Sequence, residues 1–385
     1  MLGGYDATCQ RDLTIGGVEK WVRKRLAACQ SAAGESLMEC RHGPGLSLRA
    51  VCVLAAISLP AGFASAADPQ LIAAAKREGE VTWYTTQIIT QFGRPAADAF
   101  QKKYGIRVNL VRGDSVEIAV RLTNEAKANR VQGDLYDGTG TTTLLKKEGV
   151  ALKWLPDAAK RWPQQYWDAE GYWIATNVYV HTPAFNTNLV PRGTEPKAFQ
   201  DLLDPKWKGK MAWALHATSS GAAGFIGVVL TDMGEQKGKA YLRELAKQNI
   251  TRLGGSARAV TDQAIAGEYP VVLQIFNHQP VISARRGAPI AWIAMNPAMA
   301  VLSVAGVTNG GPHPNAAKLL IDFLTSDEGQ KLFRDSDYIP AAPEVPPRDP
   351  RMRPDGTSFR GIFFTPERID AEMGLWMKSF EEIFR

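Results

Sequence analysis

The sequence predicts an α/β protein of two lobes, each a mainly parallel sheet flanked by helices, with a ligand cleft between the lobes. Two observations support this fold class. Short runs of β-branched and aromatic residues alternate with helix-like segments, as is typical of parallel sheets. One longer run, from Gly171 to Pro191, lies between two such regions, and its strand-forming part is bounded by Gly171 and Pro183. We expect this run to cross from one lobe to the other.

The first 66 residues are expected to be an N-terminal extension and signal peptide rather than part of a lobe. An apolar run at 50–63 follows Arg41 and Arg49 and precedes Ala64-Ser65-Ala66, a small-x-small cleavage pattern. The run, of about 15 residues, is shorter than the roughly 20 that a membrane-spanning helix needs. We therefore expect cleavage before Ala67 and a periplasmic mature protein. The true translation start, Met1 or Met38, stays open.

Composition agrees with export and argues against a nucleic-acid partner. The four cysteines all precede the proposed cleavage site, and an exported chain without cysteine avoids mispaired disulfides. Seven of the 45 basic and five of the 39 acidic residues also precede it, which leaves 38 and 34 in a mature chain of 319 residues. This near balance, with no dense basic stripe, predicts no nucleic-acid binding.

The mature chain opens with the alternation expected of a first lobe. Helices are predicted at 69–78, 94–104 and 116–129, and strands at 79–86, 106–111 and 134–136. Ligands bind at the carboxyl ends of parallel strands, so the three loops that follow these strands should converge at one edge. The candidate ligand-binding residues in these loops are Tyr84, Thr85, Thr86, Asp114, Ser115, Gly138 and Thr139.

A Ser/Thr-rich segment precedes an apolar helix that is expected from Phe225. A short helix and turn at 199–207 and a strand at 210–215 come before this segment. Its residues would place hydroxyl and backbone N–H groups at the positive end of the helix, where an anion is stabilised. Simple helix capping would explain the same residues. The candidates here are Ser219, Ser220, Gly221 and Ala222.

A buried strand is predicted at 267–276, and it ends in Phe276, Asn277 and His278, which should face the cleft. The mature histidines show no zinc-type spacing, so no metal site and no cofactor are predicted. Aromatic side chains in the strands would provide either apolar walls for a ligand or ordinary core packing. They are Trp83, Tyr84, Trp173, Tyr179 and Phe276.

Two acidic residues in the first-lobe loops offer a partner for an amine on the ligand. They are Asp114 and Asp137, and both also suit simple turn roles. Further along the chain, Asn315 is expected to cap a helix, and another helix is expected at 328–333. A Pro/Arg-rich surface loop at 343–354 and a helix at 365–384 should close the fold.

Three segments carry a resemblance to a known family. They read Glu-Gly-Glu-Val-Thr-Trp-Tyr at 78–84, Leu-Asp-Pro-Lys-Trp-Lys-Gly-Lys at 203–210, and Pro-His-Pro-Asn-Ala-Ala-Lys-Leu-Leu-Ile-Asp-Phe-Leu-Thr-Ser-Asp-Glu-Gly-Gln at 312–330. Over essentially all of 67–385 the chain resembles the extracellular solute-binding proteins of ABC importers, in the branch that includes ferric-iron-binding proteins. The resemblance implies a type 2 periplasmic-binding-protein fold. We expect lobe 1 at 67–177 with 300–340, and lobe 2 at 178–299 with 341–385.

The resemblance also implies what such a protein binds and where. Members that hold ferric iron use a His, a Glu and a Tyr-Tyr pair, and the matching positions fall near Ile88, near Thr139 and at Asn277-His278. Ile88 supplies no oxygen ligand, which ferric iron requires. The family's anion site does match, at Ser220, Gly221 and Ala222. Small-molecule binding, hinge closure and ABC permease subunits as partners of a monomer are the resulting expectations.

The sequence thus predicts a periplasmic substrate-binding component of an ABC importer, with a small organic anion as its solute. The alternative ligand is ferric iron, in a site built from Asp114, Asp137, Tyr179 and His278. An enzyme on the same fold is a further alternative, and we do not expect it. The mature sequence contains no Gly-x-Ser-x-Gly, no Cys nucleophile, no metal constellation and no phosphate loop.

Overall fold

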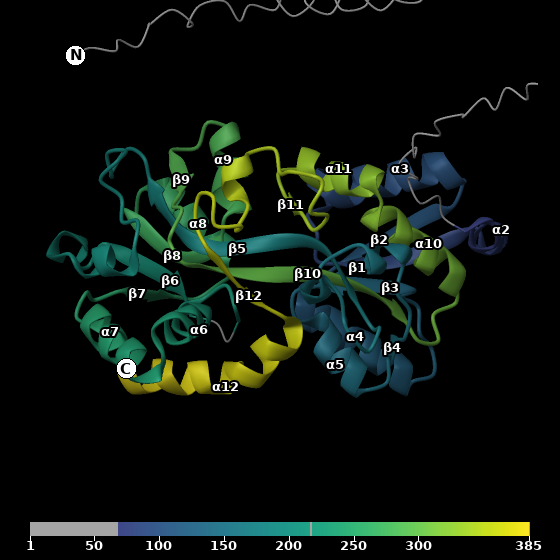
Figure 1. The fold of residues 1–385 in the computed structure, drawn as a ribbon, viewed down its shortest axis with the longest axis horizontal. Coiled ribbons are helices and arrows are strands. Elements are labelled where there is room, and N and C mark those ends of the chain that lie inside the picture. The colour runs from purple at the N-terminus through teal and green to yellow at the C-terminus, as the bar shows by residue number, and fades with distance from the viewer. Residues whose placement is uncertain (1–67, 216–217, 385) are drawn as a thin grey trace, which may run out of the picture. The chain divides into compact units, whose positions relative to one another are not determined.

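Residues 68–215 and 218–384, described by a computed structural model, contain a 12-stranded sheet with helices on both faces (Figure 1). They belong to one unit, Gly62–Arg385. The expected signal peptide, its cleavage site, all four cysteines and residues 216–217 of the Ser/Thr-rich region lie outside the described residues. Within the described part of the chain, no helix combines the length and the apolar character needed to cross a membrane.

Two long strands occupy the centre of the sheet: β5 (Ile174–Asn186) and β10 (Ala298–Thr308). They pair antiparallel, with Met299 opposite His181 and Ala305 opposite Ile174. Every residue of both strands is buried. We call β5 and β10 the central pair, because the rest of the sheet is built outward from them. The expected lobe boundaries at 177/178 and 299/300 fall inside these two strands, and the third, at 340/341, follows β11 (Ile339–Pro340); the division into lobes stays a prediction.

The strands beyond β10 form what we call the first wing. Its own pairings are parallel, and its connection to β10 is antiparallel. The strands, in order from the edge, are β2 (Arg107–Arg112), β1 (Glu80–Thr85) and β3 (Leu135–Gly138). On one side of this wing lie α2 (Pro69–Glu78), α3 (Arg94–Tyr104), α10 (Pro314–Thr325) and α11 (Asp327–Asp335) (Figure 1). On the other side lie α4 (Ser115–Lys127) and α5 (Thr141–Lys147).

The strands beyond β5 form the second wing, which is also parallel within itself. They are β8 (Val271–Phe276), β6 (Met211–Ala214) and β7 (Thr251–Leu253). One face is covered by α6 (Ala222–Met233), α7 (Glu235–Ala246) and α12 (Pro366–Ile383), and the other by α8 (Ala257–Ala266) and α9 (His278–Arg285) (Figure 1). Short strands also pair with the central pair: β4 (Ala151–Leu152), β9 (Ile290–Trp292), β11 (Ile339–Pro340) and β12 (Gly361–Phe364). Short helical turns are η1 (Ile89–Gly93), η2 (Asp157–Lys160), η3 (Gln164–Tyr166), η4 (Phe199–Leu203), η5 (Pro205–Trp207) and η6 (Pro350–Met352).

Local sequence signals place several helix ends where they were expected. Helix α2 begins after Asp68, whose side chain accepts from the Gln70 N–H, and ends at Gly79 with a φ of 77°. The start of α10 corrects one expectation, because Asn315 lies inside the helix and is not its cap. Pro314 at the first helical position sets the start. The backbone and side-chain amides of Asn315 instead donate to the carboxylate of Glu78.

The central strand β5 extends past the predicted stop at Pro183 and ends at Asn186. Proline lacks an N–H donor, so a strand tolerates it where the pairing is irregular. The register between β5 and β8 shifts between Thr182 and Ala184, which accommodates Pro183. Its carbonyl still accepts from the Ile293 N–H at 2.8 Å.

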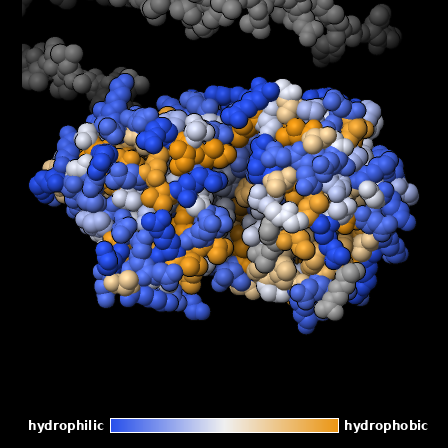
Figure 2. Space-filling model, turned by 180° about the vertical axis from the view of Figure 1, so that it is seen from behind, coloured by the Kyte–Doolittle hydropathy of each residue, from blue (hydrophilic) through white to orange (hydrophobic). Residues whose placement is uncertain are grey.

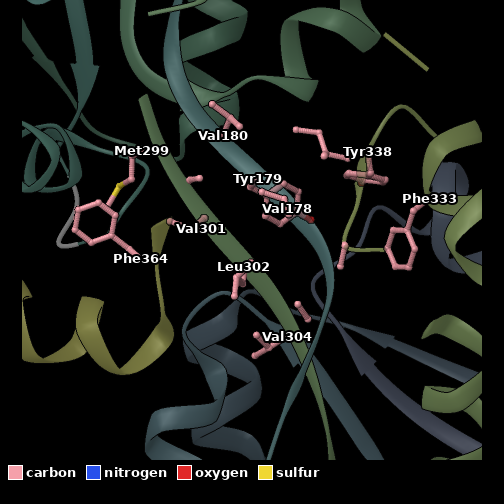
Figure 3. Packing of buried hydrophobic residues seen from close by; sticks show 14 of the residues in the cluster. Val178, Tyr179, Val180, Met299, Val301, Leu302, Val304, Phe333, Tyr338 and Phe364 are labelled. Carbon is pink, nitrogen blue, oxygen red and sulfur yellow. The ribbon is translucent and has the colours of Figure 1, made fainter. Parts of the chain in front are cut away.

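The core packs on both faces of the central pair. Figure 3 shows Val178, Val301 and Leu302 along β5 and β10, with Tyr338 between Tyr179 and Phe333. Below the second wing, Trp376 of α12 is 1% exposed and packs edge-on against Phe364, with ring centroids 5.5 Å apart. Helix α6 approaches this indole at a glycine, because a Cβ on Gly227 would lie 2.5 Å from the ring. The last helix is therefore part of the core.

We expect Trp376→Ala to lower the free energy of unfolding by about 3–5 kcal/mol, because the indole is buried and its loss leaves a cavity. Leu375→Ala, on the same helix at a side chain that is 46% exposed, should change it by less than about 0.5 kcal/mol. Urea unfolding measures both. Equal small effects would show that α12 is not part of the cooperative core.

Candidate ligand-binding site

The three loops of the first wing meet at Gly138, as the sequence predicts. Gly138 ends β3 with a φ of 146°, and a Cβ there would lie 2.7 Å from Ser115 Oγ and 3.1 Å from Thr86 Cγ2. Thr86 follows β1, and Ser115 begins α4 after β2. Only a residue without a side chain permits this approach. Thr139 follows Gly138 and is half-buried, and direct ligand contact by these residues stays a prediction.

Asp137 is sealed beneath these loops. Its carboxylate accepts hydrogen bonds from Trp83 Nε1 at 2.8 Å, Thr85 Oγ1 at 2.5 Å, and both the N–H and the Oγ1 of Thr86 at 2.8 and 2.6 Å. Burial raises the pKa of Asp137, and these four hydrogen bonds act in the opposite direction. The side chain holds the β1 loop to β3. It therefore has a structural role, which favours the turn role over the pairing with an amine, the two roles that the sequence left open.

Two other predicted ligand contacts have structural roles. Asp114 caps α4 by accepting from the N–H groups of Val116 and Glu117 at 2.9 Å, and Glu117 returns a capping-box bond to the Asp114 N–H. Tyr84 points to the opposite side of β1 from Trp83 and Thr85, toward α4, where its hydroxyl donates to Glu125 at 2.7 Å. The alternation of side chains along a strand explains why Tyr84 leaves the edge that Thr85 and Thr86 share.

On the second wing, the Ser/Thr-rich segment forms the N-terminal end of α6. No side chain caps this helix at Gly221, and Ala222 is its first residue. Ser219 is buried, and its carbonyl accepts from Gln274 Nε2 at 3.1 Å, while Ser220 is half-buried. The uncapped N–H groups at the helix start provide a partial positive charge without any cationic side chain.

Aromatic rings gather between β5, β8 and α9. The ring of Tyr179 lies 5.0 Å from Phe276, 5.1 Å from His278 and 5.9 Å from Tyr338, measured between centroids. His278 does not end a strand as expected, because it is the first residue of α9; it is buried, and its expected place at the cleft stays a prediction. Sequence reasoning missed Tyr338, since nothing in the local pattern places it beside β5.

Among the described residues, Asn277 Nδ2 and His278 Nδ1 are buried nitrogen atoms near these rings without a hydrogen-bond partner, on side chains that are 1% and 6% exposed. The nitrogens of His181, which is 1% exposed, also lack a partner of good geometry, although the Ser219 backbone lies close enough to this ring to raise its pKa. His181 and His278 both lie beside Phe276, at centroid distances of 4.5 and 5.5 Å. An unpaired buried polar group costs about 1–3 kcal/mol, so this cluster marks a place where a bound polar molecule would be stabilised.

Gln87 connects the first-wing loops with the central pair. Its Nε2 donates to Asn177 Oδ1 at 3.1 Å and to Ser303 Oγ at 3.3 Å, and its Oε1 accepts from the Tyr179 hydroxyl at 3.2 Å. Gln87 is not among the residues predicted from the sequence, although it directly follows Thr86, which is. The candidate site therefore joins the β1 loop, through Gln87 and Tyr179, to the rings of the second wing.

Figure 2, seen from behind, shows a furrow between the two halves of the unit, with apolar residues along its edges. The described ranges contain no group of three or more His, Cys, Asp or Glu side chains arranged to hold a metal ion. The site is thus built from neutral hydrogen-bonding groups, aromatic rings and a helix N-terminus.

We expect the two buried histidines to set much of the acid sensitivity of the fold. Burial lowers the pKa of both His181 and His278 from 6.5 to about 3. Below pH 6.5 the two histidines are protonated in the unfolded chain but stay neutral in the folded chain. The stabilising contribution of the neutral histidines is therefore present above pH 6.5 and is lost as the pH falls toward 3. Each should account for about 2–3 kcal/mol of lost stability between pH 7 and pH 4.5.

Urea unfolding of His181→Gln and His278→Gln at both pH values measures this contribution. Each variant should lose less stability on acidification than the parent does, whatever its stability at pH 7. An unchanged difference between the two pH values in both variants would contradict the assignment.

The sequence is similar to those of two named periplasmic binding proteins. An "Fe(3+)-binding periplasmic protein" of Serratia marcescens is 26% identical over 251 residues, which cover 62% of this chain and 71% of the relative. A "Putative 2-aminoethylphosphonate-binding periplasmic protein" of Salmonella paratyphi A is 25% identical over 294 residues, covering 74% of this chain and 82% of the relative.

The fold also matches solved structures of periplasmic binding proteins. The binding protein AfuA of Actinobacillus pleuropneumoniae, solved with exogenous fructose 6-phosphate bound, superposes with a TM-score of 0.65 at 22% identity. The match covers 79% of this chain and 98% of AfuA. It confirms the two-lobed periplasmic-binding-protein fold that the sequence predicts.

A family model decides the assignment. The model described as "Bacterial extracellular solute-binding protein" matches residues 95–355, which is more than half of the chain and includes β2, β3, the central pair and the second wing. The chain belongs to the bacterial extracellular solute-binding protein family.

Proposed function

We propose that this protein is the periplasmic solute-binding component of an ABC importer and that it captures a small organic anion between its lobes for delivery to permease subunits. Relatives with names of this kind, including a "Probable ABC transporter periplasmic-binding protein" of Sinorhizobium fredii, support the transport role. Transport binding proteins, rather than enzymes, make up the relatives cited here, which supports a non-catalytic role.

The observation that carries the proposal is the uncapped start of α6 beside unpartnered buried nitrogens. The backbone of Ser219, just before this helix, lies next to the ring of His181. An anion at Ser220 and Gly221 would receive backbone N–H groups and the favourable end of the helix dipole. The Asn277 amide and the protonated nitrogen of each neutral imidazole, His181 and His278, would add donors.

The same geometry disfavours the alternative ferric site, which would use the carboxylates of Asp114 and Asp137. Asp114 caps α4 and Asp137 is held by four internal hydrogen bonds, so both carboxylates would have to be released. A hard cation such as ferric iron takes carboxylate and phenolate oxygens. Removing Asp137 from its partners would leave four donors on β1 and its loop unpaired, which is costly in a buried position.

A second candidate ligand is nonetheless ferric iron, because two buried phenols lie close to an imidazole. Tyr179 and Tyr338 have ring centroids 5.9 Å apart, and His278 lies 5.1 and 5.0 Å from them. The relative from Serratia marcescens is named for iron. Burial raises the pKa of both tyrosines, so phenolate formation would need the charge of the metal itself.

Calorimetry with ethylphosphonate, fructose 6-phosphate, citrate and ferric citrate tests the two ligands. At least one metal-free anion should bind, and Ser220→Asp should weaken it about tenfold to thirtyfold, because the new carboxylate repels the anion and takes the dipole stabilisation at the helix start, which is worth up to roughly 2 kcal/mol. Thr194→Asp adds the same charge at an exposed loop and should have little effect. A tyrosinate-to-iron absorption band that survives Ser220→Asp would establish the iron alternative.

We also propose that the ligand closes the two lobes, with the central pair crossing between them. A ligand of about 1 μM affinity contributes roughly 8 kcal/mol of binding free energy, which is enough to shift a modest preference for an open form. Small-angle X-ray scattering should show a smaller radius of gyration with a saturating anion and no such change for Ser220→Asp at the same anion concentration. Identical dimensions for the parent with and without the anion would contradict hinge closure.

A further inference from the structure

We propose that the anionic ligand carries hydroxyl groups, and not an ammonium group, at its other end, and that Asn277 and His278 contact those hydroxyls. This inference rests on the proposed function and adds the substrate class: hydroxylated oxyanions such as phosphate esters or phosphonates of polyols. It follows from how the structure uses its carboxylates and from which buried groups it leaves unpaired.

An ammonium ion in a buried site needs a carboxylate partner, because an unpaired charge is expensive to remove from water. Asp137 is the carboxylate whose charge reaches the rings of Tyr179 and Tyr338. Its oxygens already accept from Trp83, Thr85 and Thr86. Asp114, the other acidic residue at this edge, accepts two backbone N–H groups at the start of α4. The oxygens of both carboxylates are therefore already engaged in internal hydrogen bonds, and neither is free to pair with an ammonium ion.

The unpartnered groups have the opposite character. Asn277 Nδ2 can only donate, and a neutral imidazole such as His278 has one donor and one acceptor nitrogen. A hydroxyl both donates and accepts, so it can satisfy these groups together. An ammonium group only donates, and it would place a proton against the Asn277 amide.

Charge near α9 also disfavours a cation. The guanidinium of Arg258 in α8 donates to Ser283 Oγ of α9 at 3.0 Å. Its positive charge, together with His181 and after burial, lowers the pKa of His278. Arg258 thus acts on this ring as a cation even though it pairs with Asp262. The same field would repel an ammonium ion beside His278.

The aromatic rings do not compensate for the missing carboxylate. A cation bound over an aromatic face needs that face exposed to it. Tyr179 is packed against Phe276, Tyr338 and His278, with interplanar angles of 75°, 71° and 35°. These rings cover one another, so they form a wall for the carbon skeleton of a ligand and not a cage for a quaternary or primary amine.

Three matched phosphonates test the inference on the mature protein by calorimetry at pH 7. They are 2-hydroxyethylphosphonate, 2-aminoethylphosphonate and ethylphosphonate, which differ only at the group distant from phosphorus. We expect the hydroxyl compound to bind about tenfold or more tightly than either of the others, since a site built to bond a hydroxyl rejects an analogue without it.

Equal or tighter binding of the amine would overturn the inference, as would equal binding of the ethyl and hydroxyl compounds. In both cases the anion site itself would still be supported, because ethylphosphonate binds through phosphorus oxygens alone. If none of the three binds, the proposed anion function fails for this class, and the inference fails with it.

Two substitutions at Asn277 supply an independent readout. Asn277→Asp keeps the shape and adds the missing carboxylate, so it should shift the ratio of amine to hydroxyl affinity by about tenfold toward the amine. Asn277→Ala should bring the ratio of hydroxyl to ethyl affinity close to one. Asn124→Asp, at an exposed position on α4, should leave both ratios unchanged. Unchanged ratios in folded Asn277→Asp and Asn277→Ala would show that this residue does not contact the ligand.

Discussion

Complete burial of the central pair is the constraint on which the rest of the structure depends. Every residue of β5 and β10 is shielded from water, so a polar side chain within them is costly unless it has a partner inside the protein; several have one, whereas His181 and Thr308 do not. Thr176 Oγ1 donates to the carbonyl of Ser303, and the Thr176 carbonyl in turn accepts from Gln330 Nε2 of α11 at 2.9 Å. Gln87 reaches in from the β1 loop to Asn177 and Ser303. The polar residues of the central strands therefore tie the first-wing helices and loops to the middle of the sheet.

The two wings contribute differently to the site. The polar groups of the first-wing loops are largely hydrogen-bonded to one another, around Asp137 and the α4 cap. This side is therefore preformed, and few of its polar groups are free to bond a ligand. The second wing instead supplies an uncapped helix start and unpartnered nitrogens. A ligand held this way would have its charge stabilised by backbone dipoles, which are fixed by the helix and need no reorganisation when it binds. Selectivity would then come from hydrogen bonding at the neutral end.

Local signals in the sequence were sufficient where a residue's role depends on its immediate neighbours. Glycine and proline placed the ends of α2 and α3, and loop convergence followed from the alternation of strands and helices. They failed where a role depends on the opposite strand. Strand β10 went unrecognised because its small and apolar residues lack period-two alternation, as expected for a strand buried on both faces. The partners of Asp137 and Tyr84 lie far away in sequence or on a face that only the pairing register defines, and no local signal places Tyr338 beside β5. Asp114 differs, because its capping partners Val116 and Glu117 follow it directly and its turn role was one of the two that the sequence left open.

The position of β10 has a consequence for how the chain acquires its shape. Strand order places β10 between β3 and β5, yet more than a hundred residues, including most of the second wing, separate β10 from β5 in sequence. A chain emerging from its N-terminus can assemble β1, β2 and β3, and later the parallel strands around β8, but the two groups have no common sheet until β10 has arrived. Before that moment β5 exposes a long unpaired edge and β3 a short one, and such edges are templates for pairing with other chains. Segments that meet only after such long separations assemble slowly. A secreted protein of this fold is therefore most prone to aggregation late in translocation across the membrane, when β10 and the residues after it, about the last quarter of the chain, have yet to emerge.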